Sequence, residues 1–455
     1  MSGNRRIPGF NGRLIEPADP DFEAARLTNN GAVDARPALI AAPDSAADVQ
    51  AVVRWARSAG QPLAVRSGGH SIAGHSTGDG AVILDMGGLN DIEIDPGPDA
   101  DWAWAGPGVR AAAFTLAAYE RGRAVSFGDT GSVGLGGLVL GGGIGWLLRK
   151  YGLTVDSLLE AEMVTADGEL ITASADEHAD LFWALRGGGG NFGVVTRYKL
   201  ALRPIGAVLH GMLLMPATRD NIHQVMAIGS AAPDDLTLMP YVMAIPPMDE
   251  VPASEHGKLG LWVDSLWAGE AKEGASVLAS LRRLGPVLMD TVAEKPYPDV
   301  YPPPAEGSER GGWTSSSIFL DPIGDDVLDV VEQAMSAAPP HDCLVIFRIL
   351  GGAAGRVPAD ATAFGWRDER LLAWIIGAHG EADQSPMPAL RTWVSDFRAA
   401  LATRGRGAFV SFLGDDSPEM VAAAYPVATF ARLRRVKRRY DPANVFQRNH
   451  NIPPA

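Results

Sequence analysis

The sequence predicts an α+β protein of two or three domains, on three observations. Its 455 residues are 46% hydrophobic and 20% charged, an ordinary globular balance with material for several cores. Up to about residue 205, short apolar strands alternate with helical patterns and glycine-rich loops. From about residue 206, the chain is rich in Met and Pro and carries long apolar runs separated by helical patterns.

The first region begins with an irregular lead-in over residues 1–34. Asp44 or Ser45 is expected to cap a helix of valines at helical spacing, and Gly60 ends it. A short strand then enters a glycine-rich loop. The elements expected after this loop are the strand AVILDM, a helix around 111–122, a hairpin turning at Asp167 and Gly168, the helix DLFWALR and the strand VVTRYKLAL.

The second region contains seven candidate strands, which we expect to form one antiparallel sheet backed by helices. The strands are AVLHGMLLM, LTLMPYVMA, LGLWVDSLW, TSSSIFL, CLVIFRIL, LLAWIIGA and FVSFL. The helical patterns fall near 218–231, 269–284, 324–337 and 386–404. The end of the chain is expected to be helical from Ser417 to Tyr440 and to stop at Asp441 and Pro442, before an extended polar tail.

Composition excludes several classes of function. A net charge of −15 and a pI near 5.1 give no support for nucleic-acid binding. A single cysteine, Cys343, excludes an internal disulfide framework and a multi-cysteine metal site. No apolar stretch approaches the roughly 20 residues that span a bilayer, and the N-terminus lacks a signal-like apolar segment. We therefore expect a cytoplasmic protein without a membrane partner, and the oligomeric state stays open.

Two familiar motifs occur in the wrong context. Gly188, Gly190 and Gly193 match GxGxxG, but this segment leaves a helix and enters a strand, the reverse of a dinucleotide fingerprint. Residues 74–78 match GxSxG, which would make Ser76 a hydrolase nucleophile, but a strand follows instead of the required helix. A serine hydrolase therefore stays an alternative only. The spacing of His70 and His75 and the absence of HExxH give no metal site.

Three glycine-dense segments lie within about 130 residues, at 67–80, 128–145 and 187–193. Glycine allows positive φ and lets backbone N–H groups approach an anion closely, and a diphosphate is such an anion. Three such loops favour a long cofactor wrapped by backbone, although glycine also serves tight turns and close packing. His70 follows Gly68 and Gly69 in the first loop, where its ring could reach the same ligand.

These motifs resemble one family over nearly the whole chain. Residues 66–71 (RSGGHS) resemble a flavin-attachment loop. Residues 141–145 (GGGIG), together with 149–153 and Asp156 that follow them, resemble a second cofactor-binding segment. Residues 191–196 (NFGVVT) and the tail 440–446 with Asn449, Asn451 and Ile452 complete the pattern. The family is that of the bacterial berberine-bridge-enzyme-like FAD-linked oxidases of the vanillyl-alcohol oxidase superfamily, which have a PCMH-type FAD-binding domain.

The resemblance implies FAD bonded to His70. It also implies a two-part FAD domain, residues 1–205 with a core at about 35–205, completed by 415–455, and a substrate domain over 206–414. The implied cofactor-binding residues are Arg66, Ser67, Gly68, Gly69, His70, Ser71, Gly74, His75, Gly128, Thr130, Gly131, Gly134, Gly137, Gly141, Gly142, Gly145, Asn191, Gly193, Val194, Asn449 and Asn451.

Two departures from the family pattern matter. Some relatives form a second flavin bond through a cysteine where this chain has Thr130, so we expect a single link. Catalytic tyrosines of many relatives are replaced here by Phe412 and Phe430, and phenylalanine cannot take a proton. The remaining candidates for the catalytic base are Tyr241, Tyr425 and Glu381.

The implied activity is that of a flavin oxidase. It takes a hydride from a small organic substrate, either an alcohol on a secondary metabolite or sugar or a substrate of oxidative cyclisation, and O2 reoxidises the flavin to give H2O2. Met and Trp residues on candidate strands, such as Trp313, could line an apolar pocket, although most are expected in the core. A dehydrogenase with another acceptor and a non-catalytic flavin-binding protein stay open as alternatives.

Overall fold

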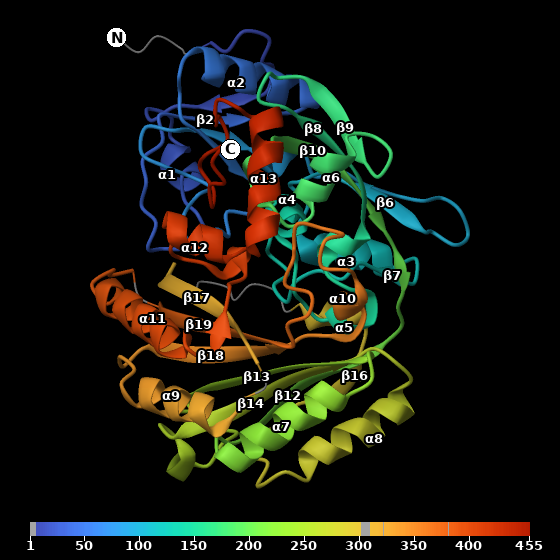
Figure 1. Cartoon of the computed structure of the whole chain (residues 1–455), viewed down its shortest axis with the longest axis vertical. Helices are drawn as coiled ribbons and strands as arrows, with labels where there is room; N and C mark the ends of the chain where they lie inside the picture. Colours follow the sequence, from blue (N-terminus) through green and yellow to red (C-terminus); the bar gives the residue numbers. More distant parts are fainter. Residues whose placement is uncertain (1–5, 302–309, 322, 381) are drawn as a thin grey trace.

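The computed structural model describes residues 6–301, 310–321, 323–380 and 382–455. Figure 1 shows two halves, with the first described elements and the C-terminal tail in one and the large sheet in the other. In the described parts, no helix is long and apolar enough to cross a membrane.

The first half contains two main sheets. The four-stranded sheet has the order β1-β2-β4-β3, formed by Arg13–Ile15, Leu39–Ala42, Val82–Asp85 and Leu63–Arg66. The five-stranded antiparallel sheet has the order β5-β6-β10-β8-β9, formed by Ile92–Ile94, Trp102–Ala105, Val194–Ala201, Leu158–Val164 and Leu170–Ser174. A short pair joins β7 (Arg123–Ala124) to β11 (Arg203–Pro204). The helices are α1 (Phe22–Ala25), α2 (Ala46–Ser58), α3 (Ala111–Tyr119), α4 (Leu135–Gly141), α5 (Leu148–Tyr151) and α6 (Ala179–Leu185).

Local sequence signals explain these elements. The Ser45 hydroxyl accepts the N–H of Asp48 and caps α2, as expected, and Gly60 follows the helix with φ of 60°. The β8–β9 hairpin turns at Asp167 and Gly168, where Gly168 has φ of 78°. The lead-in was expected to be irregular, but it contains β1, which pairs with β2, and the short helix α1.

The second half is built on one antiparallel sheet of nine strands. Its order is β15-β12-β14-β13-β18-β19-β17-β20, with β16 also paired to β12. The bounds are β12 Val208–Pro216, β13 Leu236–Ala244, β14 Leu259–Trp267, β15 Met289–Asp290, β16 Ala293–Lys295, β17 Gly312–Leu320, β18 Asp342–Ile349, β19 Leu371–His379 and β20 Gly405–Arg406. The helices are α7 Arg219–Ala231, α8 Ala271–Arg282, α9 Asp325–Ser336, α10 Gly352–Arg356 and α11 Met387–Leu401.

The two faces of the large sheet have different roles. One face packs against α7, α8, α9 and α11 and forms a core with residues such as Val263, Val345 and Ile375. Strand residues alternate between faces, so the register places Met212, Asp264 and Met239 together on the other face. That face lies toward the first half of the molecule (Figure 1), and residues from both halves form a common cluster there, including Met239 and Trp146.

Six of the seven expected strands are confirmed as β12, β13, β14, β17, β18 and β19, and the expectation for FVSFL is wrong. Val410–Phe412 form a 3-10 helix, η6. The Ser315 and Ser317 hydroxyls on β17 donate to the carbonyls of Phe412 and Phe409, so side-chain bonds replace a strand ladder.

The single helix expected over 417–440 is two helices, α12 (Pro418–Ala423) and α13 (Val427–Tyr440). Pro426 separates them because it has no N–H to donate and disfavours helical backbone at the residue before it.

Candidate active site

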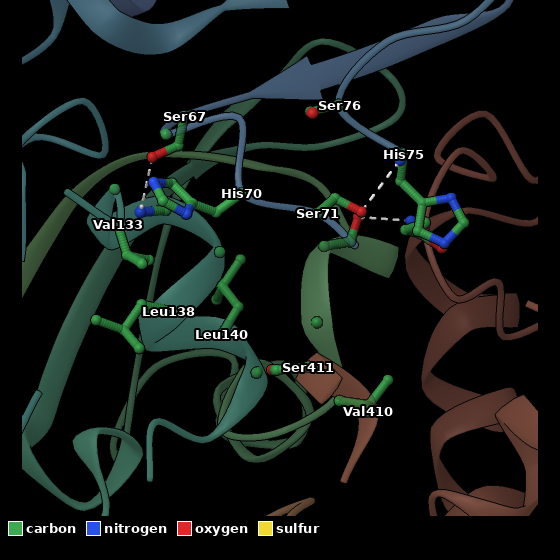
Figure 2. A pocket seen from close by; sticks show the side chains of 18 of the residues that line it. Ser67, His70, Ser71, His75, Ser76, Val133, Leu138, Leu140, Val410 and Ser411 are labelled. Atoms are coloured by element: carbon green, nitrogen blue, oxygen red, sulfur yellow. Dashed lines mark hydrogen bonds between the residues drawn. The ribbon is translucent and has the colours of Figure 1, made fainter. Parts of the chain in front are cut away.

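One large cavity lies where the two halves meet, with a volume of about 340 Å³. Its walls come from the loop after β3, the segment around α4, the loop before β10, strands β17 and β19, η6 and the C-terminal tail. A second cavity, beside Leu148 and Arg367, measures about 10 Å³, room for about one water molecule. Figure 2 shows the large cavity, with His70 and His75 on opposite sides of the view. A volume above 300 Å³ is typical of ligand sites.

The first glycine loop is held against the segment of α4 by close backbone contacts. The Ser67 hydroxyl donates to the Pro107 carbonyl at 2.5 Å and accepts the N–H of Gly136 at 3.2 Å. A Cβ on Gly68 would lie 2.3 Å from the Gly134 nitrogen, so only glycine fits there. The two loops therefore form one continuous backbone wall.

Three histidines that line the cavity are uncharged near neutral pH. Burial, assisted by the charge of Arg110, lowers the pKa of His70 to about 4. Burial likewise lowers the pKa of His75 to about 4 and that of His450 to about 3. The rings of His75 and His450 meet edge to face with centroids 4.7 Å apart.

The cavity has the properties of a site for a large polar cofactor. A Cβ added to Gly137 or Gly190 would meet nothing within 4 Å, so both backbones border open space. Within the described residues, lining atoms His75 Nε2, Ser76 Oγ and Asn449 Oδ1 are buried without a hydrogen-bond partner. Buried polar atoms normally have partners, so the presence of three such atoms in one cavity fits a ligand rich in hydrogen-bonding groups, such as FAD.

Fifteen of the 21 expected cofactor residues line this cavity. They are Ser67, Gly68, Gly69, His70, Ser71, His75, Gly128, Thr130, Gly134, Gly137, Gly141, Asn191, Gly193, Val194 and Asn449. The structure does not bring Arg66, Gly74, Gly131, Gly142, Gly145 and Asn451 to the lining.

The residues off the lining have other contacts. Arg66 pairs with Asp85 at 2.6 Å. A Cβ on Gly145 would lie 1.7 Å from the Phe127 carbonyl oxygen, and one on Gly142 would lie 2.9 Å from the Phe409 ring. These glycines allow close packing behind the loop. Asp156, expected in the same segment, instead forms a buried two-point ion pair with Arg367, at 2.7 and 2.8 Å.

The tail is anchored beside the cavity by a buried ammonium group. Lys437 Nζ on α13 donates to Asp441 Oδ2 at 2.7 Å, to the Asn191 carbonyl at 2.7 Å and to the Phe446 carbonyl at 2.9 Å. The Asn191 side chain in turn donates to the His450 carbonyl at 3.2 Å and accepts the N–H of Ile452. The third glycine loop and the tail are thus joined as one wall.

Aromatic side chains from the large sheet form the opposite wall. The Trp374 ring on β19 stacks on Phe412 of η6, with centroids 3.9 Å apart and an interplanar angle of 8°. Trp313 on β17 also lines the cavity. Its backbone is held by Asn30, whose side chain donates to the Trp313 carbonyl at 2.9 Å and accepts its N–H at 3.1 Å.

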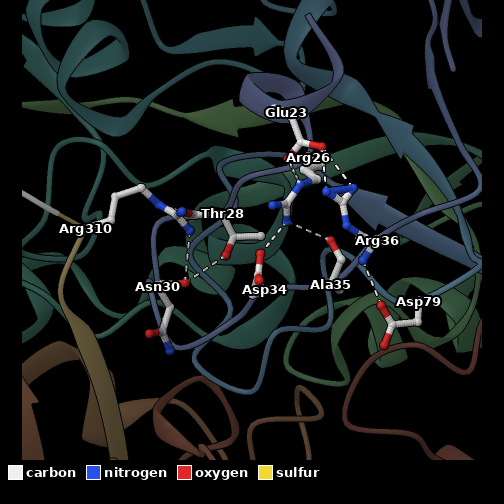
Figure 3. Close-up of polar contacts among 9 residues, drawn as sticks. All are labelled: Glu23, Arg26, Thr28, Asn30, Asp34, Ala35, Arg36, Asp79 and Arg310. Atoms are coloured by element: carbon white, nitrogen blue, oxygen red, sulfur yellow. Dashed lines mark hydrogen bonds and ion pairs between the residues drawn. The ribbon is translucent and has the colours of Figure 1, made fainter. Parts of the chain in front are cut away.

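The segment that carries Asn30 is fixed by a polar network near the surface. Arg310 donates to the carbonyls of Thr28 and Asn30, and Arg26 pairs with Glu23 and Asp34 (Figure 3). The lead-in therefore positions the aromatic wall.

The three expected candidates for the catalytic base have different surroundings. Tyr425 lines the cavity, its hydroxyl donates to the Gly187 carbonyl at 3.3 Å, and burial raises its pKa. Tyr241 does not line the cavity, and its hydroxyl contacts Met212 Sδ at 3.4 Å. Glu381 lies outside the described residues. Phe412 lines the cavity, whereas Phe430 stacks on Tyr425 with centroids 6.0 Å apart.

Two residues of the site were not predicted from the sequence: Asp129, which lines the cavity, and Arg348, which pairs with it. The available signal for Asp129 was an acidic residue inside a glycine-rich loop. Arg348 carried a weaker signal, as a charge inside the apolar run CLVIFRIL.

The fold and this backbone-lined cavity define a flavin-dependent oxidoreductase. The chain matches the model of a family described as FAD binding domain over residues 37–174 and that described as berberine and berberine like over 408–453. It is 33% identical to (R)-6-hydroxynicotine oxidase of Paenarthrobacter nicotinovorans, covering 100% of this chain and 99% of that one. It is 30% identical to an uncharacterized FAD-linked oxidoreductase of Bacillus subtilis, covering 97% of each.

Solved structures agree with this assignment. A crystal structure of 6-hydroxy-D-nicotine oxidase from Arthrobacter nicotinovorans superposes with a TM-score of 0.85 at 28% identity and covers 98% of both chains. A chitooligosaccharide oxidase has the same fold, with a TM-score of 0.85 at 21% identity, covering 98% of this chain and 97% of that one. The chain belongs to the berberine-bridge-enzyme-like FAD-linked oxidoreductases of the vanillyl-alcohol oxidase superfamily, and it is an enzyme that uses FAD, as the resemblance implied.

Proposed function

We propose that this oxidoreductase carries FAD on a single covalent bond to His70 and oxidises a hydroxyl-bearing small molecule, with O2 as the final acceptor. The observation that supports it most directly is the position of His70. Its ring is in the wall of the large cavity, and it follows Gly68, a position where only glycine fits against Gly134.

The state of His70 suits covalent attachment. Burial and the charge of Arg110 lower its pKa to about 4, so at neutral pH the ring keeps a nitrogen lone pair that can form a bond. Thr130 also lines the cavity, but a hydroxyl cannot replace the cysteine that forms a second bond in some relatives. Cys343 on β18 is buried and does not line the cavity, which supports a single link.

Different parts of the cavity wall would bind the cofactor and the substrate. When bound, FAD supplies a two-electron acceptor for the substrate's hydride and a donor of those electrons to O2. The backbone N–H groups of the glycine loops orient its polar groups. Trp313, Trp374 and Phe412 give the substrate a flat apolar surface and keep water away from it.

The substrate class is proposed from this wall and from the relatives. Stacked aromatic rings suit a ring-shaped substrate, and the names of relatives include a xylooligosaccharide oxidase and the berberine-bridge-enzyme-like 17 protein. An alcohol on a sugar or secondary metabolite is our first choice. Oxidative cyclisation, and a dehydrogenase with a different acceptor, are the second.

The covalent link is tested by intact-protein mass together with the visible spectrum of the acid-denatured pellet. We expect wild type to be heavier by one FAD with a yellow pellet, and His70→Ala to lose both features. His75→Ala is the matched control, because His75 lines the same cavity and should leave the added mass unchanged. A wild-type pellet without colour would contradict the link. Peroxide release during alcohol oxidation in air tests the role of O2.

We also infer the domain division 1–205, 206–414 and 415–455. It is supported by the ion pair and carbonyl contacts of Lys437, which return α13 and the tail to the third glycine loop. A cytoplasmic location and a role in secondary metabolism stay predictions.

A further inference from the structure

We propose that Asp129 is the proton acceptor of the reaction and that Arg348 is the positioning residue that holds it in place. The proposal rests on the proposed oxidation of an alcohol. It assigns the proton to a residue outside the positions where relatives carry catalytic tyrosines.

Asp129 is the one carboxylate among the described residues that line the large cavity. It lies between Gly128 and Thr130 at the start of the second glycine-rich segment, residues 128–145. Its Oδ2 forms an ion pair with Arg348 Nη2, and its Oδ1 accepts the Thr130 hydroxyl at 3.0 Å. The carboxylate is fixed at both oxygens, yet 26% of the side chain is still exposed.

Arg348 places this carboxylate at the aromatic end of the cavity. The Arg348 side chain is 1% exposed, and its Nη1 contacts Met239 Sδ. Its guanidinium carbon lies 5.4 Å from the centroid of the Trp374 ring and 5.8 Å from that of Phe412. Since both rings line the cavity, a substrate stacked on that wall would have its hydroxyl within the neighbourhood of Asp129.

Other titratable groups that line the cavity are less suited to accept this proton. The Tyr198 and Tyr425 hydroxyls already donate to the carbonyls of Gly136 and Gly187, and burial raises the pKa of both. His75 and His450 come from the first glycine loop and the tail instead of the aromatic wall, and their rings meet each other edge to face. Asp264 is near the Asp129 and Arg348 charges but does not line the cavity.

The step balances as an alcohol oxidation. The O–H bond of the substrate breaks and its proton passes to the Asp129 carboxylate, while the oxygen electron pair forms the C=O bond. The C–H bond breaks with its electron pair, which leaves as hydride to the bound flavin. The alcohol is oxidised to a carbonyl compound, the flavin is reduced by two electrons, and O2 then takes those electrons and two protons to give H2O2.

The test compares anaerobic flavin reduction in wild type, Asp129→Ala and Asp129→Asn, using a panel of benzyl alcohol, 1-phenylethanol, glucose, cellobiose and cyclohexanol. We expect both variants to retain the wild-type flavin content and to be reduced about 10²- to 10⁴-fold more slowly. Sodium acetate should accelerate Asp129→Ala in proportion to its concentration, because Arg348 can hold a small carboxylate in the vacated space. Asp167→Asn, on the exposed β8–β9 turn, should keep the wild-type rate.

A second readout does not depend on turnover. Acetate titrated into oxidised Asp129→Ala should shift the visible flavin spectrum, and it should leave Asp129→Asn unchanged because the amide fills the space. In Arg348→Lys, the alcohol should reduce the flavin more slowly than in wild type. The double variant Arg348→Lys with Asp129→Ala should respond to acetate more weakly than Asp129→Ala alone.

The outcomes separate the two proposals. Wild type that no alcohol of the panel reduces would overturn the oxidation and the role of Asp129 together. If wild type is reduced and Asp129→Asn matches it within threefold, oxidation stands and the role of Asp129 is overturned. Slow reduction without any acetate rescue or spectral response in Asp129→Ala also overturns the proton-acceptor role. If Asp129→Ala does not retain flavin, Asp129→Asn decides, since it keeps the shape and the Thr130 contact.

Discussion

Asp264 is a carboxyl group on β14 that is 25% exposed, and no lysine or arginine among the described residues forms an ion pair with it. Its Oδ1 lies 3.5 Å from His210 Nε2, but burial lowers the pKa of His210 to about 4, so this ring is neutral above that pH. Burial, with repulsion from Asp129, raises the pKa of Asp264 from 3.8 to about 7. Replacing Asp264 by Asn removes a group whose ionisation opposes folding.

The size and sign of the effect follow from proton linkage. Between the two pKa values the folded state holds a proton that the unfolded state has lost, so stability falls as pH rises through this window. A difference of about three units corresponds to about 4 kcal/mol once both states are ionised. About 1.6 kcal/mol of this is present at about pH 5, so wild type should lose about 2.5 kcal/mol relative to Asp264→Asn between about pH 5 and about pH 9.

Denaturant unfolding of both proteins at these two pH values measures the double difference, in which titrating groups that do not interact with Asp264 cancel. The control is Asp290→Asn on β15. Contact with Arg282 lowers the pKa of Asp290, so this group is ionised in both the folded and the unfolded state from about pH 5 to about pH 9, and its stability difference from wild type should stay constant over that range. A gap between wild type and Asp264→Asn that stays constant from about pH 5 to about pH 9 would refute the reasoning.

Three further predictions concern stability and cofactor loading. Lys437→Met should lower the free energy of unfolding by about 3–5 kcal/mol in denaturant titration, because it leaves Asp441 buried without its partner, whereas exposed Arg435→Met should change it by less than about 0.5 kcal/mol. Gly137→Val should fold but lose flavin absorbance, since its side chain would enter the cavity, while Gly206→Ala, also in open space but outside the cavity, should keep it. As pH falls from about 6.5 to about 4, wild type should lose stability relative to His210→Gln in denaturant titration. Over this range His210 binds a proton in the unfolded state but stays neutral in the folded state, because burial lowers its pKa. Equal pH slopes for these two proteins would contradict that assignment.

The parts of the fold that the sequence predicts are those set by local patterns. Ser45 caps α2 and Gly168 forms the β8–β9 turn through interactions with residues that are close in the sequence, so both can be predicted from local sequence. FVSFL has the composition of a strand, but the hydroxyls of Ser315 and Ser317, about 90 residues earlier, donate hydrogen bonds to two of its carbonyl groups. The segment forms a 3-10 helix instead of a strand. Such a contact between distant residues has no local signature.

The site shows the same division. Glycine loops can be found because glycine is required wherever backbones meet, as at Gly68 and Gly134. The same requirement does not show what the neighbour is: Gly142 and Gly145 were expected to contact the cofactor, but they allow close packing behind the loop and do not line the cavity. Composition does not say on which side of a glycine the close neighbour lies.

The cavity depends on contacts that cross between distant segments. Asn30 from the lead-in holds Trp313, Arg348 from the large sheet holds Asp129, and Lys437 from α13 holds the Asn191 loop and the tail. Each contact joins a wall from the first half of the chain to one from elsewhere, so no wall has its shape alone. Because these anchors are buried and charged or doubly hydrogen-bonded, each geometry is specific, and loss of one partner leaves the other unsatisfied. Changes at Asn30 or Lys437, which do not line the cavity themselves, should therefore alter flavin binding as well as stability, whereas changes to exposed pairs such as Arg57 with Asp167 should affect neither.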